Sequence, residues 1–114
     1  MIDSNTTTIV GRLTKDMELK TNTGLQVGFF TIATNRHKKK QDGSYAEEAS
    51  FIDVNIYGKY AETMAPKLKK GTQVCVVGSL KQERWNDAAG ESRSRVLITA
   101  DSIQIFGGRE HERL

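Results

Sequence analysis

Strict alternation over residues 51–57 constrains the fold of this 114-residue chain more than any other feature. The even positions are all aliphatic: Ile52, Val54 and Ile56. The odd positions hold two aromatic and two polar residues: Phe51, Asp53, Asn55 and Tyr57. Successive side chains of a strand point to opposite faces. The segment is therefore predicted to be a strand with one face in a core and the other face, which is too polar for a core, open to solvent.

The rest of the chain supplies four more predicted strands and one short helix. We expect strands over 6–15, 26–35, 50–57, 73–85 and 93–106. Apolar spacing predicts the helix over 59–68, although Pro66 lies inside that segment. A turn is expected at 21–24, and a polar loop over 37–46. Five strands with a helix between the third and fourth predict an all-β OB-fold, a Greek-key barrel, although other small barrels also have five strands.

This order places one barrel domain over residues 1–106 and leaves a short polar C-terminal stub over 107–114. Cys75 is the only cysteine, which excludes an intramolecular disulfide, and its valine neighbours predict that it lies in the core. The N-terminus lacks the features of a signal peptide, and no apolar run is as long as a membrane span. We therefore expect a cytoplasmic protein that does not contact membranes.

Positive charge is modest in total but locally concentrated. The net charge is +3, with one basic run over 36–40 and a second cluster at Lys67, Lys69 and Lys70. Such clusters are either solvated surface or the footprint of a polyanion site.

Three aromatic residues favour the polyanion interpretation. Phe51 and Tyr57 share the polar face of their strand, and Trp85 stands between Arg84 and Asn86. The alternatives are that Phe51 and Tyr57 cap the barrel ends and that Trp85 anchors a hairpin. As a stacking platform, the rings would accept any base at roughly 1–3 kcal/mol each, while cations neutralise phosphates. The pattern predicts binding of unpaired nucleic acid without sequence preference.

The segment 74–77 is apolar on both faces, which a small barrel does not need. It is either a subunit interface or a surface that the chain's own helix and loops cover.

Several motifs in this order resemble the bacterial single-stranded DNA-binding proteins, over about residues 5–109. They are Val10-Gly11-Arg12-Leu13-Thr14, the segment 30–36, Phe51-Ile52-Asp53-Val54, the segment 57–62, Leu68-Lys69-Lys70-Gly71 and the segment 85–90. The resemblance implies single-stranded DNA as partner, a role in replication, recombination and repair at the nucleoid, and a homotetramer, with a dimer as the alternative. It also implies stacking on the three rings and cations at Lys59, Lys70 and Arg84.

The complete candidate interface combines the platform, the basic run and these cations. It consists of Phe51, Tyr57, Trp85, Arg36, His37, Lys38, Lys39, Asn55, Lys59, Lys70 and Arg84.

Two departures from the family pattern stand out. Only His37 could supply the ring that many members carry near 36–38, and the alternative is a solvated loop residue. The chain also ends without the family's acidic tip, which puts recruitment of repair enzymes through such a tip in doubt.

Three other functions are alternatives to this one. An accessory OB domain similar to primosomal replication protein N, which is a dimer, and an RNA-binding OB module both fit a stacking surface. Catalysis is not expected, because no clustered carboxylates or triad pattern accompany Asp53. No metal or cofactor is expected either.

Overall fold

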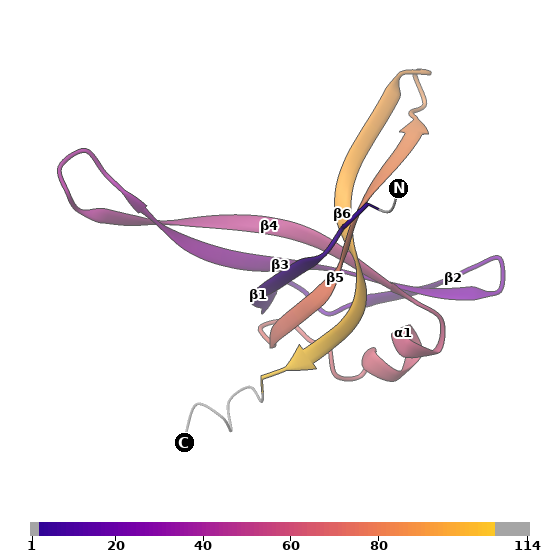
Figure 1. The fold of residues 1–114 in the computed structure, drawn as a ribbon. Helices are drawn as coiled ribbons and strands as arrows, with labels where there is room; N and C mark the ends of the chain where they lie inside the picture. Colours follow the sequence, from indigo (N-terminus) through magenta and orange to yellow (C-terminus); the bar gives the residue numbers. More distant parts are fainter. Residues whose placement is uncertain (1–2, 107–114) are drawn as a thin grey trace.

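The computed structural model describes residues 3–106, which form six strands and one helix (Figure 1). Their bounds are β1 Thr7–Leu13, β2 Glu18–Asn22, β3 Leu25–Lys39, β4 Tyr45–Tyr57, α1 Gly58–Met64, β5 Gln73–Asn86 and β6 Ser92–Ile105. The predicted C-terminal stub lies outside the described residues. Within residues 3–106, no helix has the length and apolar character needed to cross a membrane.

Strand pairing closes a barrel. The strands are ordered β1-β5-β6-β4-β3, and β1 also pairs with β3 through Arg12–Ala33 and Leu13–Ile32. All pairs are antiparallel except β4–β6, which is parallel over Val54–Ile98 and Asn55–Thr99. The helix follows the fourth strand of the chain and precedes β5. The expected all-β, five-stranded OB-fold barrel with one short helix is confirmed.

The core fills the barrel from the faces that the alternation predicted. Val54 and Ile56 of β4 are fully buried and pack with Ile32 of β3. Val74 and Val76 point inward, whereas Cys75 is only half-buried, so its predicted place in the core is wrong. Cys75 pairs with Val10 of β1 and faces outward because the pleat turns alternate residues of β5 away from the core.

The helix covers the lower end of the barrel in Figure 1 and is shorter than predicted. It ends at Met64 rather than at Leu68, because Pro66 has no amide hydrogen to continue the ladder. The chain nevertheless makes one further turn, in which Leu68 N donates to Met64 O at 3.0 Å. Leu68 is buried as a result.

Two differences concern exposed strands. The predicted loop over 37–46 is wrong, since β3 and β4 stay paired out to Lys39–Tyr45 and leave only a tight turn. The strand β2 was not predicted, and it pairs with β3 from Glu18–Phe29 to Asn22–Leu25. Every residue of β2 is exposed, so no apolar alternation marks it.

Two long hairpins project from the barrel (Figure 1). The first, β3–β4, extends to one side, and the second, β5–β6, extends upward past β4. The second contains a register shift at Val77/Gly78. A Cβ atom at Gly78 would overlap the backbone of Thr99, so glycine is required where β5 crosses β6 this closely.

Candidate nucleic-acid interface

One face of the β3–β4 ribbon carries Phe51 and Tyr57. The pairing register is uninterrupted, so the odd residues of β4 share a face with the odd residues of β3. Phe51 is 66% exposed and has only Ala33 opposite it. Tyr57 is half-buried. Neither ring caps the barrel interior. The core residues of β4 are Val54 and Ile56, which lie on the opposite face of the strand.

Asn55 shares that face but does not reach solvent. It is 4% exposed, because β6 lies beside it and Thr99 donates its hydroxyl to Asn55 Oδ1 at 3.0 Å. Asn55 Nδ2 in turn contacts Tyr57 Oη at 3.1 Å. The expectation that Asn55 faces solvent is therefore wrong. Its place in the fold is behind Tyr57, where it fixes the position of that ring's hydroxyl.

Lys81 brings a cation to the same ring. It lies on β5, and its Nζ is 5.7 Å from the centroid of the Tyr57 ring and 3.5 Å from Tyr57 Oη. This geometry is a cation–π contact. The sequence does not single out Lys81, since only the crossing of β5–β6 over β4 brings it to Tyr57.

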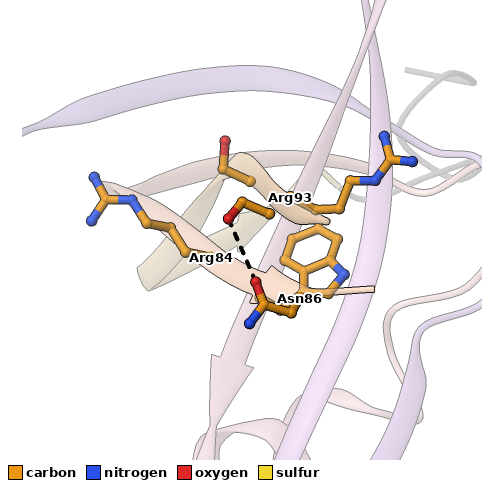
Figure 2. Close-up of a pocket in the computed structure, with 6 residues that line it drawn as sticks. Arg84, Asn86 and Arg93 are labelled. Carbon is orange, nitrogen blue, oxygen red and sulfur yellow. Dashed lines mark hydrogen bonds between the residues drawn. The ribbon is translucent and has the colours of Figure 1, made fainter. Parts of the chain in front are cut away.

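Trp85 lies near the tip of the second hairpin and is 46% exposed. Its neighbour across the ladder is Arg93. A groove of about 440 Å³ runs here, with residues of both strands along it: Arg84, Trp85, Asn86, Ser92, Arg93 and Ser94. Figure 2 shows Arg84 and Arg93 extending in opposite directions from this groove. A half-exposed indole in a basic groove is available for stacking.

Asp87 holds the turn that follows Trp85. Its Oδ1 accepts the amides of Ala89 and Glu91 at 3.0 and 2.9 Å, and its Oδ2 pairs with Arg93 Nε at 2.9 Å. The bond from Arg93, followed by these backbone amides, lowers the pKa of the Asp87 carboxyl below its ordinary value of 3.8. The turn thus fixes Arg93 beside Trp85.

Arg84 occupies the other side of the second hairpin. Neighbouring residues of a strand point to opposite faces, so Arg84 and Trp85 do not share one. Arg84 Nη2 donates to Gln82 Oε1 at 2.8 Å. Both residues also line a second groove of about 730 Å³, together with Lys81, Gln82, Glu83 and Arg95.

The basic run lies on the first hairpin rather than in a loop. His37 and Lys39 share the Phe51 face by register, whereas Arg36 and Lys38 point to the opposite face. Lys38 pairs with Glu48 at 3.8 Å, and all four residues are exposed. The His37 ring meets Tyr45 edge-on, with centroids 6.5 Å apart. Tyr45 is 64% exposed and was missed, because its segment read as a loop.

Lys59 and Lys70 lie apart from the second hairpin. Lys59 is exposed on α1, two residues after Tyr57. Lys70 is exposed in the loop before β5, where its backbone amide donates to Asp16 Oδ1 at 2.8 Å. The helix and this loop lie at the opposite end of the barrel from the tip of the second hairpin (Figure 1). The predicted residues therefore form a long, divided surface rather than one compact pocket.

The described part of the chain contains no group of three or more His, Cys, Asp or Glu side chains arranged to hold a metal ion.

Comparison with known proteins identifies the family. The model of the single-strand binding protein family matches residues 4–106. The chain belongs to this family. The single-stranded DNA-binding protein of Helicobacter hepaticus is 42% identical over 106 residues, which cover 92% of this chain and 62% of that protein. The Treponema pallidum protein of the same name is 43% identical over 108 residues, covering 94% and 60%. This member of the single-strand binding family thus spans about three fifths of these relatives.

Solved structures show the same barrel. A deletion mutant of the single-stranded DNA binding protein from Thermus aquaticus superposes with a TM-score of 0.82 at 26% identity, over 93% of this chain and 52% of that one. A Plasmodium falciparum SSB in complex with single-stranded DNA gives a TM-score of 0.83 at 19% identity, over 93% and 97%. At 19% identity, the likeness to the Plasmodium falciparum protein shows a shared fold alone.

Proposed function

We propose that this protein binds single-stranded DNA without sequence preference, by stacking bases on aromatic rings while cations neutralise phosphates. The observation that carries the proposal is the exposure of Phe51 and Trp85, at 66% and 46%, on two basic hairpins of one barrel. Large rings left in water beside cations lose burial energy that a core would supply. Stacked bases restore it, and they do so for any sequence because every base has a π-face.

The surface provides both parts of such an interface. Phe51, Tyr57 and Trp85 supply the rings, and His37 and Lys39 lie further along the Phe51 face. Arg36, Lys38, Lys59, Lys70 and Arg84 add charge around the barrel. Asn55 acts by positioning Tyr57 and not by touching DNA.

The relatives named above are single-stranded DNA-binding proteins, which supports a role in protecting unpaired strands during replication, recombination and repair. The binding unit would be the OB domain over residues 1–106, working in the cytoplasm at the nucleoid. Holding a strand in this way requires no bond to be made or broken.

Titration with oligo-dT at several salt concentrations tests the proposal. Trp85 is the only tryptophan, so its fluorescence reports the site directly. We expect quenching on binding and similar affinity for oligo-dT and mixed sequences of equal length. The logarithm of the binding constant should fall linearly with the logarithm of salt concentration. Oligo-U in competition at one salt concentration separates DNA binding from RNA binding. Absence of binding at low salt would contradict the proposal.

We also propose that the protein is a homotetramer. Val10, Cys75 and Val77 lie on neighbouring positions of β1 and β5 and point away from the core. Val10 is 42% exposed, and the other two are half-buried. This outward apolar patch supports a subunit interface. The same patch could serve a dimer, and a mass measurement in solution distinguishes the two states.

A further inference from the structure

Arg95, on β6 of the second hairpin, contacts residues of three other strands. Its Nε and Nη2 each lie 3.0 Å from Glu83 Oε1 on β5, and its Nη1 lies 3.6 Å from Asp53 Oδ2 on β4. Its Cζ is 5.2 Å from the centroid of the Phe29 ring on β3. One guanidinium thus spans two carboxylates while it covers an aromatic ring.

These groups stand on the route between the stacking rings. Glu83 pairs with Arg95, and Trp85 pairs with Arg93 two residues along the same ladder, so Arg95 and Trp85 share a face of the second hairpin. Asp53 is two residues from Phe51 on the same face of β4. The groove of about 730 Å³ that contains Trp85 is also lined by Glu83 and Arg95. A strand running from Trp85 to Phe51 would pass over Arg95.

Two carboxylates are unfavourable at this place on a surface that meets a polyanion. Arg95 offsets them, but the pairs are open to water: the side chains of Arg95, Asp53 and Glu83 are 40%, 35% and 31% exposed. Ion pairs this exposed contribute little to stability, so they can exchange partners. Arginine also makes strong bidentate contacts with phosphate. Phe29 is half-buried and lines a separate cavity of about 100 Å³, whose lining also includes Lys15, Asp16 and Glu18.

We propose that Phe29 and Arg95 form a further nucleotide subsite, which Asp53 and Glu83 keep closed until DNA binds. On binding, Arg95 leaves the two carboxylates for a phosphate oxygen, and the Phe29 ring it covered receives a base. The released carboxylates recruit cations from solution, which offsets part of the counterion release that drives binding. This inference rests on the proposed binding of single-stranded DNA.

The first test removes the carboxylates before it removes the arginine. In the wild-type chain, Arg95→Ala would also expose two unpaired carboxylates to DNA, so the comparison is made in an Asp53→Asn/Glu83→Gln background. That background should bind labelled oligo-dT more tightly than wild type. The slope of log K against log salt should be steeper, because cation uptake no longer opposes binding. Adding Arg95→Ala removes one phosphate contact and should then flatten the slope by about 0.7, and Arg95→Lys should largely restore it.

The matched control is Glu62→Gln/Asp101→Asn, which raises the net charge equally from exposed residues on α1 and β6. It should leave the salt slope close to that of wild type. If Arg95→Ala leaves the slope of the Asp53→Asn/Glu83→Gln background unchanged, Arg95 does not take up a phosphate and the inference is wrong.

Phe29→Leu tests the base. It keeps an apolar side chain at a half-buried position, and thermal unfolding checks that the fold survives. Loss of a stacked base should weaken oligo-dT binding by at least about fivefold, with the salt slope unchanged. Wild-type affinity in a folded Phe29→Leu chain would rule out the stacking subsite. If wild-type protein does not bind oligo-dT at all, the proposed function itself fails, which separates the two conclusions.

Discussion

At the scale of single residues, Trp85 has the sharpest expected effect. Replacing it with alanine should weaken oligo-dT binding by about 1–3 kcal/mol, since the half-exposed ring loses one stacked base and little core packing. Trp85→Phe is the matched control and should keep most of the affinity. Anisotropy of labelled oligo-dT measures both variants, because the alanine variant has no tryptophan signal. Equal affinity of wild type and Trp85→Ala would show that the indole is not a stacking ring.

Asn55 should affect the fold more directly than Trp85 does. Asn55→Ala removes the acceptor for the Thr99 hydroxyl and the donor that faces Tyr57 Oη. Leaving these partly buried groups without partners should lower the free energy of unfolding by about 1–3 kcal/mol. Urea unfolding measures the loss, and Tyr57→Phe separates the share that belongs to the tyrosine hydroxyl. An Asn55→Ala chain as stable as wild type would contradict this account of the buried amide.

The same residues show what alternation can reveal. The two-residue alternation of the strand correctly predicted that Val54 and Ile56 lie in the core and that Phe51 lies in solvent. It misplaced Asn55, because alternation describes the two faces of a strand and not the neighbour that covers one of them. Thr99 reaches Asn55 only through the short parallel contact of β4 with β6. Lys81 and Arg95 were missed for the same reason, since each meets its ring across strands distant in sequence.

At the scale of elements, the tip of the second hairpin should depend on pH through Asp87. The pKa of this carboxyl is lowered in the folded chain, chiefly by Arg93, from an ordinary value of 3.8. The ordering it provides is therefore complete above about pH 4 and lost as pH falls through the lowered value. NMR of the Ala89 and Glu91 amides should follow that loss, and Asp87→Asn should abolish the pH dependence. Asp101→Asn on β6 should not. Amide shifts that do not change below pH 4 in wild type would contradict this role of Asp87.

The two hairpins also show why element boundaries were harder to predict than element order. The barrel strands contain apolar residues that repeat with the pleat, and their order predicted the fold correctly. The ribbon from 36 to 49 has water on both faces, so it has no core to impose a pattern, and its charged sequence read as a loop. The fully exposed β2 was missed for the same reason. Four of the eleven candidate interface residues, Arg36, His37, Lys38 and Lys39, lie on the ribbon from 36 to 49.

For the whole molecule, the arrangement of charge matters more than its total. A net charge of +3 gives only weak attraction for a polyanion. Local cations on both hairpins, α1 and the following loop surround the barrel instead. If one strand contacts all of them, it must wrap around the domain, and several subunits with their barrels joined would extend that path. Effective concentration then makes each additional domain increase the affinity for a long strand.

In the proposed tetramer, the apolar patch on β1 and β5 would tie assembly to binding. We expect the wild-type assembly to have four times the mass of one chain. Val77→Lys should lower that mass, because burying the lysine charge at the interface without a partner is unfavourable. Val96→Lys is the control: Val96 is also an exposed valine, at 59%, but lies on the second hairpin, away from the patch. Sedimentation measures each mass. The dissociated chain should keep its rings, and so bind short oligo-dT, but lose affinity for long strands. An unchanged mass for a folded Val77→Lys chain would place the interface elsewhere.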